Sequence, residues 1–119
     1  QKLKIDSKDF QVLMADEMDQ INNKKLNIIN YQDSDEKGSH WVAFFHDDKN
    51  KLYFDPFGIE PLENIQKCVY NAIQVQPYRT RLCGQLCLYV LYKLENGSGD
   101  SATFDTLISE LLITFKRML

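Results

Sequence analysis

The sequence contains few cysteines and no long apolar run. Its three cysteines are Cys68, Cys83 and Cys87. Three cysteines cannot all pair within one chain and are too few for a disulfide framework, which favours a reducing compartment. No apolar stretch reaches the length that spans a membrane, and the first residues lack the apolar core of a signal peptide. The sequence therefore predicts an intracellular protein with no membrane partner.

Basic residues are also scarce. The 14 Lys and Arg residues are outnumbered by 17 Asp and Glu residues, which gives a formal net charge of −3. Binding to a phosphate backbone selects the opposite sign of charge, so we do not expect nucleic acid as a partner. Hydrophobic residues make up 44% of the chain and charged residues 26%, as is typical of globular proteins. The length suits one domain, residues 1–119, with its own core.

What the chain does contain is a succession of apolar segments separated by turn residues. Residues 47–50 have turn chemistry and join two aromatic-rich segments into a predicted hairpin. We expect an α+β fold, in which helices flank a small, mainly antiparallel sheet, with Cys83 at the N-terminus of the central helix. Apolar spacing predicts helices over 6–23, 60–72, 83–94 and 103–118, and strands over 26–31, 40–46, 51–55 and 73–76.

Cys83 is the candidate nucleophile. It lies where the central helix is predicted to begin, and a thiol there meets unpaired backbone N–H groups and the positive end of the helix dipole. Both favour thiolate over thiol. Buried cysteine is common, so Cys83 taken alone would be a core residue, as we expect Cys68 and Cys87 to be.

A candidate base and a candidate acid lie on the predicted hairpin. If the hairpin loop has an even length, Val42 lies opposite Asp55, and His40 becomes a same-face diagonal neighbour of Asp55 at about 7–8 Å. A loop of odd length or a bulge would put Asp55 on the other face. In the first case Asp55 accepts a hydrogen bond from the ring of His40, and His40 deprotonates Cys83.

Each of these residues also has a structural explanation. His40 alone would be a surface histidine at a strand start, and Asp55 before Pro56 would be turn chemistry. Together and in this order they favour nucleophilic acyl transfer. The alternative chemistry is a zinc site on Cys83 and Cys87, but their spacing matches none of the usual paired ligands, so we expect no metal and no cofactor.

Acyl transfer also requires donors for the oxyanion. The backbone N–H of Cys83 and the side-chain amide of Gln76 are the candidates, with Gln74 as the alternative to Gln76. Gly84 follows the nucleophile and would keep the surface beside the sulfur clear.

The order His, Asp, Gln, Cys, with these neighbours, resembles that of the adenain and ubiquitin-like-protein protease group of cysteine proteases. The resemblance covers residues 30–92 and implies the adenain-like protease fold, with the triad and the Gln76 oxyanion hole. It also implies that Trp41 lines a narrow channel for small residues ahead of the cleaved bond. The matching segments are Gly38-Ser39-His40-Trp41-Val42, Tyr53-Phe54-Asp55-Pro56-Phe57-Gly58, Gln76, and Arg81-Leu82-Cys83-Gly84-Gln85-Leu86-Cys87-Leu88-Tyr89.

Within that group, the short chain resembles the maturation proteases of virophages and of virus-like transposons of the Polinton or Maverick type. The resemblance implies a cysteine endopeptidase that cuts a capsid precursor at glycine-containing sites, in the host cytoplasm or nucleus or packaged in virions. Some relatives use a peptide cofactor, so a peptide activator is a candidate partner. Two alternatives remain: a deubiquitinase- or deSUMOylase-like protease acting on ubiquitin-like modifier tails, and an inactive pseudo-protease that binds an extended peptide by strand addition.

Overall fold

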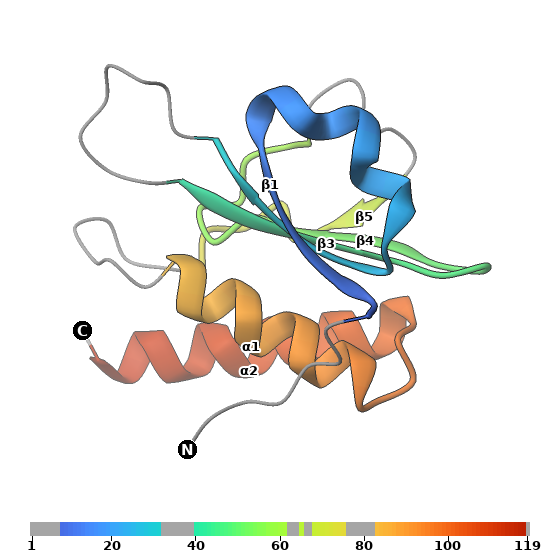
Figure 1. Ribbon diagram of the computed structural model, residues 1–119. Coiled ribbons are helices and arrows are strands. Elements are labelled where there is room, and N and C mark those ends of the chain that lie inside the picture. Colours follow the sequence, from blue (N-terminus) through green and yellow to red (C-terminus); the bar gives the residue numbers. More distant parts are fainter. Residues whose placement is uncertain (1–7, 32–39, 62–64, 66–67, 76–82, 119) are drawn as a thin grey trace.

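The computed structural model describes residues 8–31, 40–61, 65, 68–75 and 83–118 of the chain. A five-stranded sheet with the strand order β1-β2-β3-β4-β5 lies at its centre (Figure 1). The strands are β1 (Phe10–Met14), β2 (Leu26–Asn30), β3 (Trp41–His46), β4 (Lys51–Phe54) and β5 (Val69–Tyr70).

The sheet is mixed, so the expectation of a mainly antiparallel sheet is wrong, although the α+β class is confirmed. β3 pairs antiparallel with both of its neighbours, whereas β1–β2 and β4–β5 are parallel pairs. The reason lies in the connections. A tight turn joins antiparallel strands, whereas parallel strands need a longer crossover, and β1 reaches β2 through the helical segment η1 (Ala15–Asn23).

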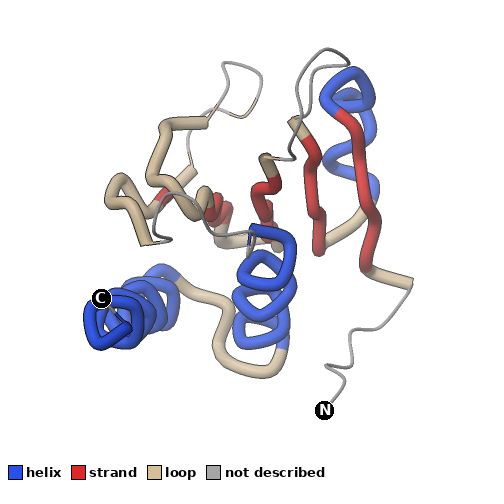
Figure 2. Tube along the Cα trace, turned by 90° about the vertical axis from the view of Figure 1, so that its left-hand side faces the viewer, coloured by secondary structure: helices blue, strands red, loops and turns tan. Residues whose placement is uncertain are grey.

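Helices cover both faces of this sheet. The helices α1 (Cys83–Glu95) and α2 (Ser101–Met118) lie on one face, and η1 lies over the other (Figure 1, Figure 2). No helix within the described ranges is long and apolar enough to cross a membrane.

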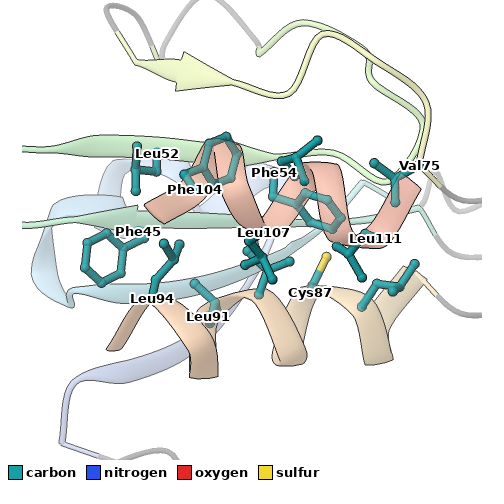
Figure 3. Packing of buried hydrophobic residues seen from close by; sticks show 14 of the residues in the cluster. Phe45, Leu52, Phe54, Val75, Cys87, Leu91, Leu94, Phe104, Leu107 and Leu111 are labelled. Atoms are coloured by element: carbon teal, nitrogen blue, oxygen red, sulfur yellow. The ribbon is translucent and has the colours of Figure 1, made fainter. Parts of the chain in front are cut away.

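The two faces of the sheet carry two separate apolar clusters. Successive side chains of a strand point to opposite faces, and in β3 Ala43 and Phe45 join the first cluster whereas Val42 and Phe44 join the second. The first cluster is packed between the sheet and the helices α1 and α2 (Figure 3). The second includes Met18 and Ile21 of η1.

The helix predicted near the N-terminus is partly wrong, because its first half is the strand β1. Leu13 is buried while its neighbours Val12 and Met14 are exposed, which is the alternation of a strand. The helical part starts only at η1, where Met18 and Ile21 are buried as expected. A few apolar residues on an edge strand fit a three- and four-residue spacing equally well, so periodicity could not separate the two structures.

The helix predicted over 60–72 is also wrong at the residues of this range that the structure describes. Residues 59–61 and 68 are not helical, and Val69–Tyr70 form β5. No strand is seen at residues 73–75, and Gln76 lies outside the described residues. Pairing of β5 with the distant strand β4 decides the backbone conformation here, so tertiary context overrides the local apolar pattern.

The central hairpin has the predicted register. Ala43 lies opposite Phe54, and the same register continued by one residue sets Val42 opposite Asp55. The loop closes on Asp47, whose Oδ1 accepts the backbone N–H groups of the second and third residues after it at 2.8 and 2.7 Å. The loop is therefore of the even length that brings His40 and Asp55 to one face.

Candidate active site

The predicted contact between His40 and Asp55 is present. Nε2 of His40 lies 2.9 Å from Oδ2 of Asp55, within hydrogen-bond distance. The side chain of Asp55 is 2% exposed and that of His40 is 26% exposed. The pair therefore combines a carboxylate shielded from solvent with a partly exposed imidazole.

Two aromatic rings orient the imidazole. The ring of Tyr31 is stacked on that of His40, with centroids 6.1 Å apart and planes 22° apart, and the ring of Phe57 lies at 5.4 Å. The backbone N–H of Tyr31 also donates to the carbonyl of His40 at 2.9 Å, which extends the β2–β3 pairing to this residue. Sequence reasoning assigned no role to Tyr31 or Phe57, although the hairpin register places Phe57 opposite His40.

The turn after β4 uses the other oxygen of Asp55. Oδ1 accepts the backbone N–H of Phe57 at 2.8 Å, and the backbone carbonyl of Asp55 accepts the N–H of Gly58 at 2.8 Å. Gly58 has a φ of 73°, and a Cβ there would lie 2.5 Å from the carbonyl carbon of Ile73, so only glycine fits. The turn and the contact with His40 thus each use one oxygen of the same carboxylate.

Asn71, which sequence reasoning missed, holds the backbone of Asp55. Its Oδ1 accepts the N–H of Asp55 at 2.9 Å, and its Nδ2 donates to the carbonyl of Asp55 at 2.6 Å and to that of Ile73 at 3.0 Å. The residue is 7% exposed. No signal in the isolated sequence distinguishes this asparagine from the other polar residues of the helix predicted over 60–72.

Cys83 is the first residue of α1, as predicted, and is buried, with 5% of its surface exposed. One turn later, Sγ of Cys87 lies 3.4 Å from the carbonyl oxygen of Trp41 and points from α1 toward the sheet (Figure 3). Burial raises the pKa of the Cys87 thiol well above its usual value, and nearby Cys83 and Asp55 raise it further. The start of α1 therefore packs against the residue that directly follows His40.

The structure also brings Trp41 and Gly84 together. A Cβ on Gly84 would lie 3.8 Å from Cδ1 of the Trp41 indole. Trp41 is half-buried and packs against the first cluster, so it contributes to the core as well as lying beside the start of α1.

One of the two candidate glutamines lies within the described residues. Gln74 is half-buried, and its neighbour Val75 is buried and donates its backbone N–H to the carbonyl of Pro56 at 2.8 Å. This segment therefore runs beside the turn that follows Asp55. The preferred candidate, Gln76, lies outside the described residues.

Three titratable side chains of the second cluster have raised pKa values. Burial raises the pKa of the Tyr53 hydroxyl far above its usual range, and it also raises the pKa values of Tyr31 and Cys68. The hydroxyls of Tyr31 and Tyr53 are 3.4 Å apart. Neither tyrosine nor Cys68 is therefore ionised near neutral pH.

No cluster of three or more His, Cys, Asp or Glu side chains within the described part of the chain is placed to hold a metal ion. Comparison with known proteins adds no relative: no family model and no curated protein matches the sequence.

Proposed function

We propose that this chain is a cysteine endopeptidase, with Cys83 as nucleophile, His40 as general base and Asp55 as the group that orients the imidazole. The observation that carries the proposal is the 2.9 Å contact between His40 and the buried Asp55 carboxylate. The cysteine at the first position of α1 supports it, because a helix N-terminus favours a thiolate.

The contact assigns a role to each ring nitrogen. Nε2–H donates to Asp55, so the neutral ring carries its lone pair on Nδ1, and Nδ1 takes the thiol proton of Cys83. The thiolate attacks the carbonyl carbon of the scissile peptide bond. The tetrahedral intermediate collapses to a thioester as Nδ1–H protonates the leaving amine. Water, deprotonated by Nδ1, then hydrolyses the thioester, which releases the acid and restores the thiol.

The developing oxyanion needs two donors. The first N–H groups of a helix point out of its end, so the backbone N–H of Cys83 is one donor. The side-chain amide of Gln76, with Gln74 as the alternative, is the other. The position of Gln74 beside the turn that follows Asp55 supports a role for this segment at the site.

The proposed substrate is a capsid precursor cut at a glycine-containing sequence, a specificity that rests on the family resemblance. The closeness of the Trp41 indole to Gly84, the residue after the nucleophile, supports it, because a bulky ring beside the start of α1 favours small substrate residues there. A peptide activator and residence in the host cell or the virion belong to the same proposal. A ubiquitin-like modifier tail is the alternative substrate for the same chemistry.

The test uses a peptide vinyl sulfone that ends in glycine, with mass spectrometry to locate the modified cysteine. We expect labelling at Cys83, loss of labelling in Cys83→Ala, and a strongly reduced labelling rate in His40→Ala. His46→Ala is the matched control, because His46 lies at the opposite end of β3 and bonds to the carbonyl of Lys24. An unreactive Cys83 in a protein that still binds the peptide would replace this proposal with the peptide-binding pseudo-protease.

A further inference from the structure

We infer that Asn71 is a positioning residue of the proposed active site: its carboxamide takes the place of missing strand pairing at the end of β4 and so holds Asp55 in contact with His40. The catalytic consequence rests on the proposed function. The positioning itself can be measured without a substrate.

The need for such a residue follows from where the sheet ends. The parallel pairing of β4 with β5 sets Leu52 beside Val69 and Tyr53 beside Tyr70, and then stops. Asp55 lies beyond this pairing. The N–H and C=O groups of one strand residue point to the same side, so both backbone groups of Asp55 face the β5 side. The N–H needs a partner there, and the carbonyl, which also accepts the N–H of Gly58, can accept a second hydrogen bond.

Asn71 follows directly after β5 and supplies both partners from its side chain. A carboxamide offers a carbonyl acceptor and two N–H donors, the same groups as a backbone peptide. Oδ1 accepts the N–H of Asp55 and Nδ2 donates to its carbonyl. Aspartate lacks the donors and leucine lacks both kinds of group, so neither could replace it.

The carboxamide is itself fixed in place. Its remaining N–H donates to the carbonyl of Ile73 at 3.0 Å, while the backbone N–H of Ile73 bonds to the carbonyl of Asn71. Ala72 between them has a φ of 25°, in the region that favours glycine. This tight turn brings the carbonyl of Ile73 back to the side chain of Asn71.

Loss of this support reaches the imidazole through Asp55. Both carboxylate oxygens of Asp55 already have partners, in Phe57 and His40. With Asn71 removed, the backbone at the end of β4 can shift, and hydrogen bonds weaken steeply as distance and angle depart from their optimum. The contact with His40 is the one that must lengthen, because Phe57 moves with the same turn.

The experiment compares Asn71→Ala with Asn27→Ala. Asn27 is a matched control, because it is also buried and also makes three side-chain hydrogen bonds, but these go to Lys24, Phe44 and Gln11, in the other half of the sheet. The main measurement is solvent exchange of the His40 ring N–H proton by ¹⁵N-resolved NMR. In Asn71→Ala, the ring N–H of His46, whose Nε2 lies 2.6 Å from the carbonyl of Lys24, is the internal reference.

We expect both variants to lose similar thermal stability, but only Asn71→Ala to speed His40 ring N–H exchange, by about tenfold or more. Its kcat should fall by about 10–100-fold with KM within about twofold, as expected from a small misplacement of a catalytic group. A folded Asn71→Ala protein with parental exchange at His40, or an equal effect of Asn27→Ala, would overturn the inference.

If Asn71→Ala does not fold, Asn71→Asp takes its place, because it keeps the acceptor for the Asp55 N–H and loses both donors. Exchange at His40 should still rise, and parental exchange would again overturn the inference. Should the parental protein cleave no peptide, exchange at His40 still decides the positioning role, so the two proposals fail separately.

Discussion

Replacing Asp55 with asparagine removes the carboxylate while keeping the shape of the side chain. Oδ1 of Asp55 accepts the N–H of Phe57 at 2.8 Å and Oδ2 faces Nε2 of His40 at 2.9 Å. Asparagine has one oxygen and one NH₂ group for these two positions. If the oxygen stays on Phe57, the NH₂ group faces His40 and drives the ring hydrogen to Nδ1. If the oxygen turns to His40, the NH₂ group meets the N–H of Phe57, and two donors face each other.

The first arrangement removes the lone pair that takes the thiol proton, and the second leaves a buried donor without a partner. We expect kcat to fall by about 10⁴-fold, the cost of the same change in a serine protease triad. This corresponds to about 5.4 kcal/mol of transition-state stabilisation. The unsatisfied donor costs about 1–3 kcal/mol of stability.

The assay is cleavage of a fluorogenic peptide with glycine before the cut bond, together with thermal unfolding to show that the variant is folded. Asp47→Asn is the control, because Asp47 also accepts backbone N–H groups in a turn but lies at the other end of the hairpin. It should leave kcat unchanged. A folded Asp55→Asn protein with kcat within tenfold of the parental value would refute the role of the carboxylate.

Two further variants test the ends of the two long helices. Gly84→Ala should raise the Tm, because its Cβ would make only an ordinary 3.8 Å contact with Trp41 and alanine is favoured over glycine in a helix by about 0.5–1 kcal/mol. The same methyl group should slow cleavage of glycine-containing peptides, and unchanged cleavage would remove Gly84 from the substrate-binding surface. Asp100 caps α2, and hydrogen bonds from Thr103 lower its pKa below the usual 3.8. The charged carboxylate of Asp100 therefore stabilises the fold fully above that usual pKa, and this stabilisation is lost as the pH falls and the group is protonated. The decrease in Tm caused by Asp100→Ala should therefore be larger at about pH 7 than at about pH 2.5. A deficit independent of pH would show that the charge does not stabilise α2.

The elements that could be predicted from the sequence are those whose signals are local. The turn residues 47–50 determine the loop, the loop determines the register, and the apolar periodicity of α1 and α2 marks two helices that pack on one face. The edge strands β1 and β5 could not be predicted in this way. Each is defined by pairing with a strand distant in sequence, and the sequence of a short segment does not identify the strand with which it pairs.

The residues of the site also differ in whether local signals or distant pairing bring them together. His40 and Asp55 lie on one hairpin, so the register alone predicts that they meet. Asn71 meets Asp55 only because β5 pairs with β4, and this segment carries the apolar pattern of a helix. A residue that supports the site from a second, distant element therefore becomes visible only in three dimensions.

The three proposed catalytic residues lie at the ends of strands and helices. The reason is that the two faces of the sheet carry separate apolar clusters. His40 directly precedes β3, Asp55 directly follows β4, and Cys83 begins α1. Trp41 faces the helix side of the sheet, whereas Val42, on the side of His40, belongs to the second cluster. A thiol on α1 could not reach an imidazole through the middle of a paired sheet, so the proposed reaction requires the two groups to meet around the end of the sheet. The contact of Cys87 with the carbonyl of Trp41 holds α1 at this end.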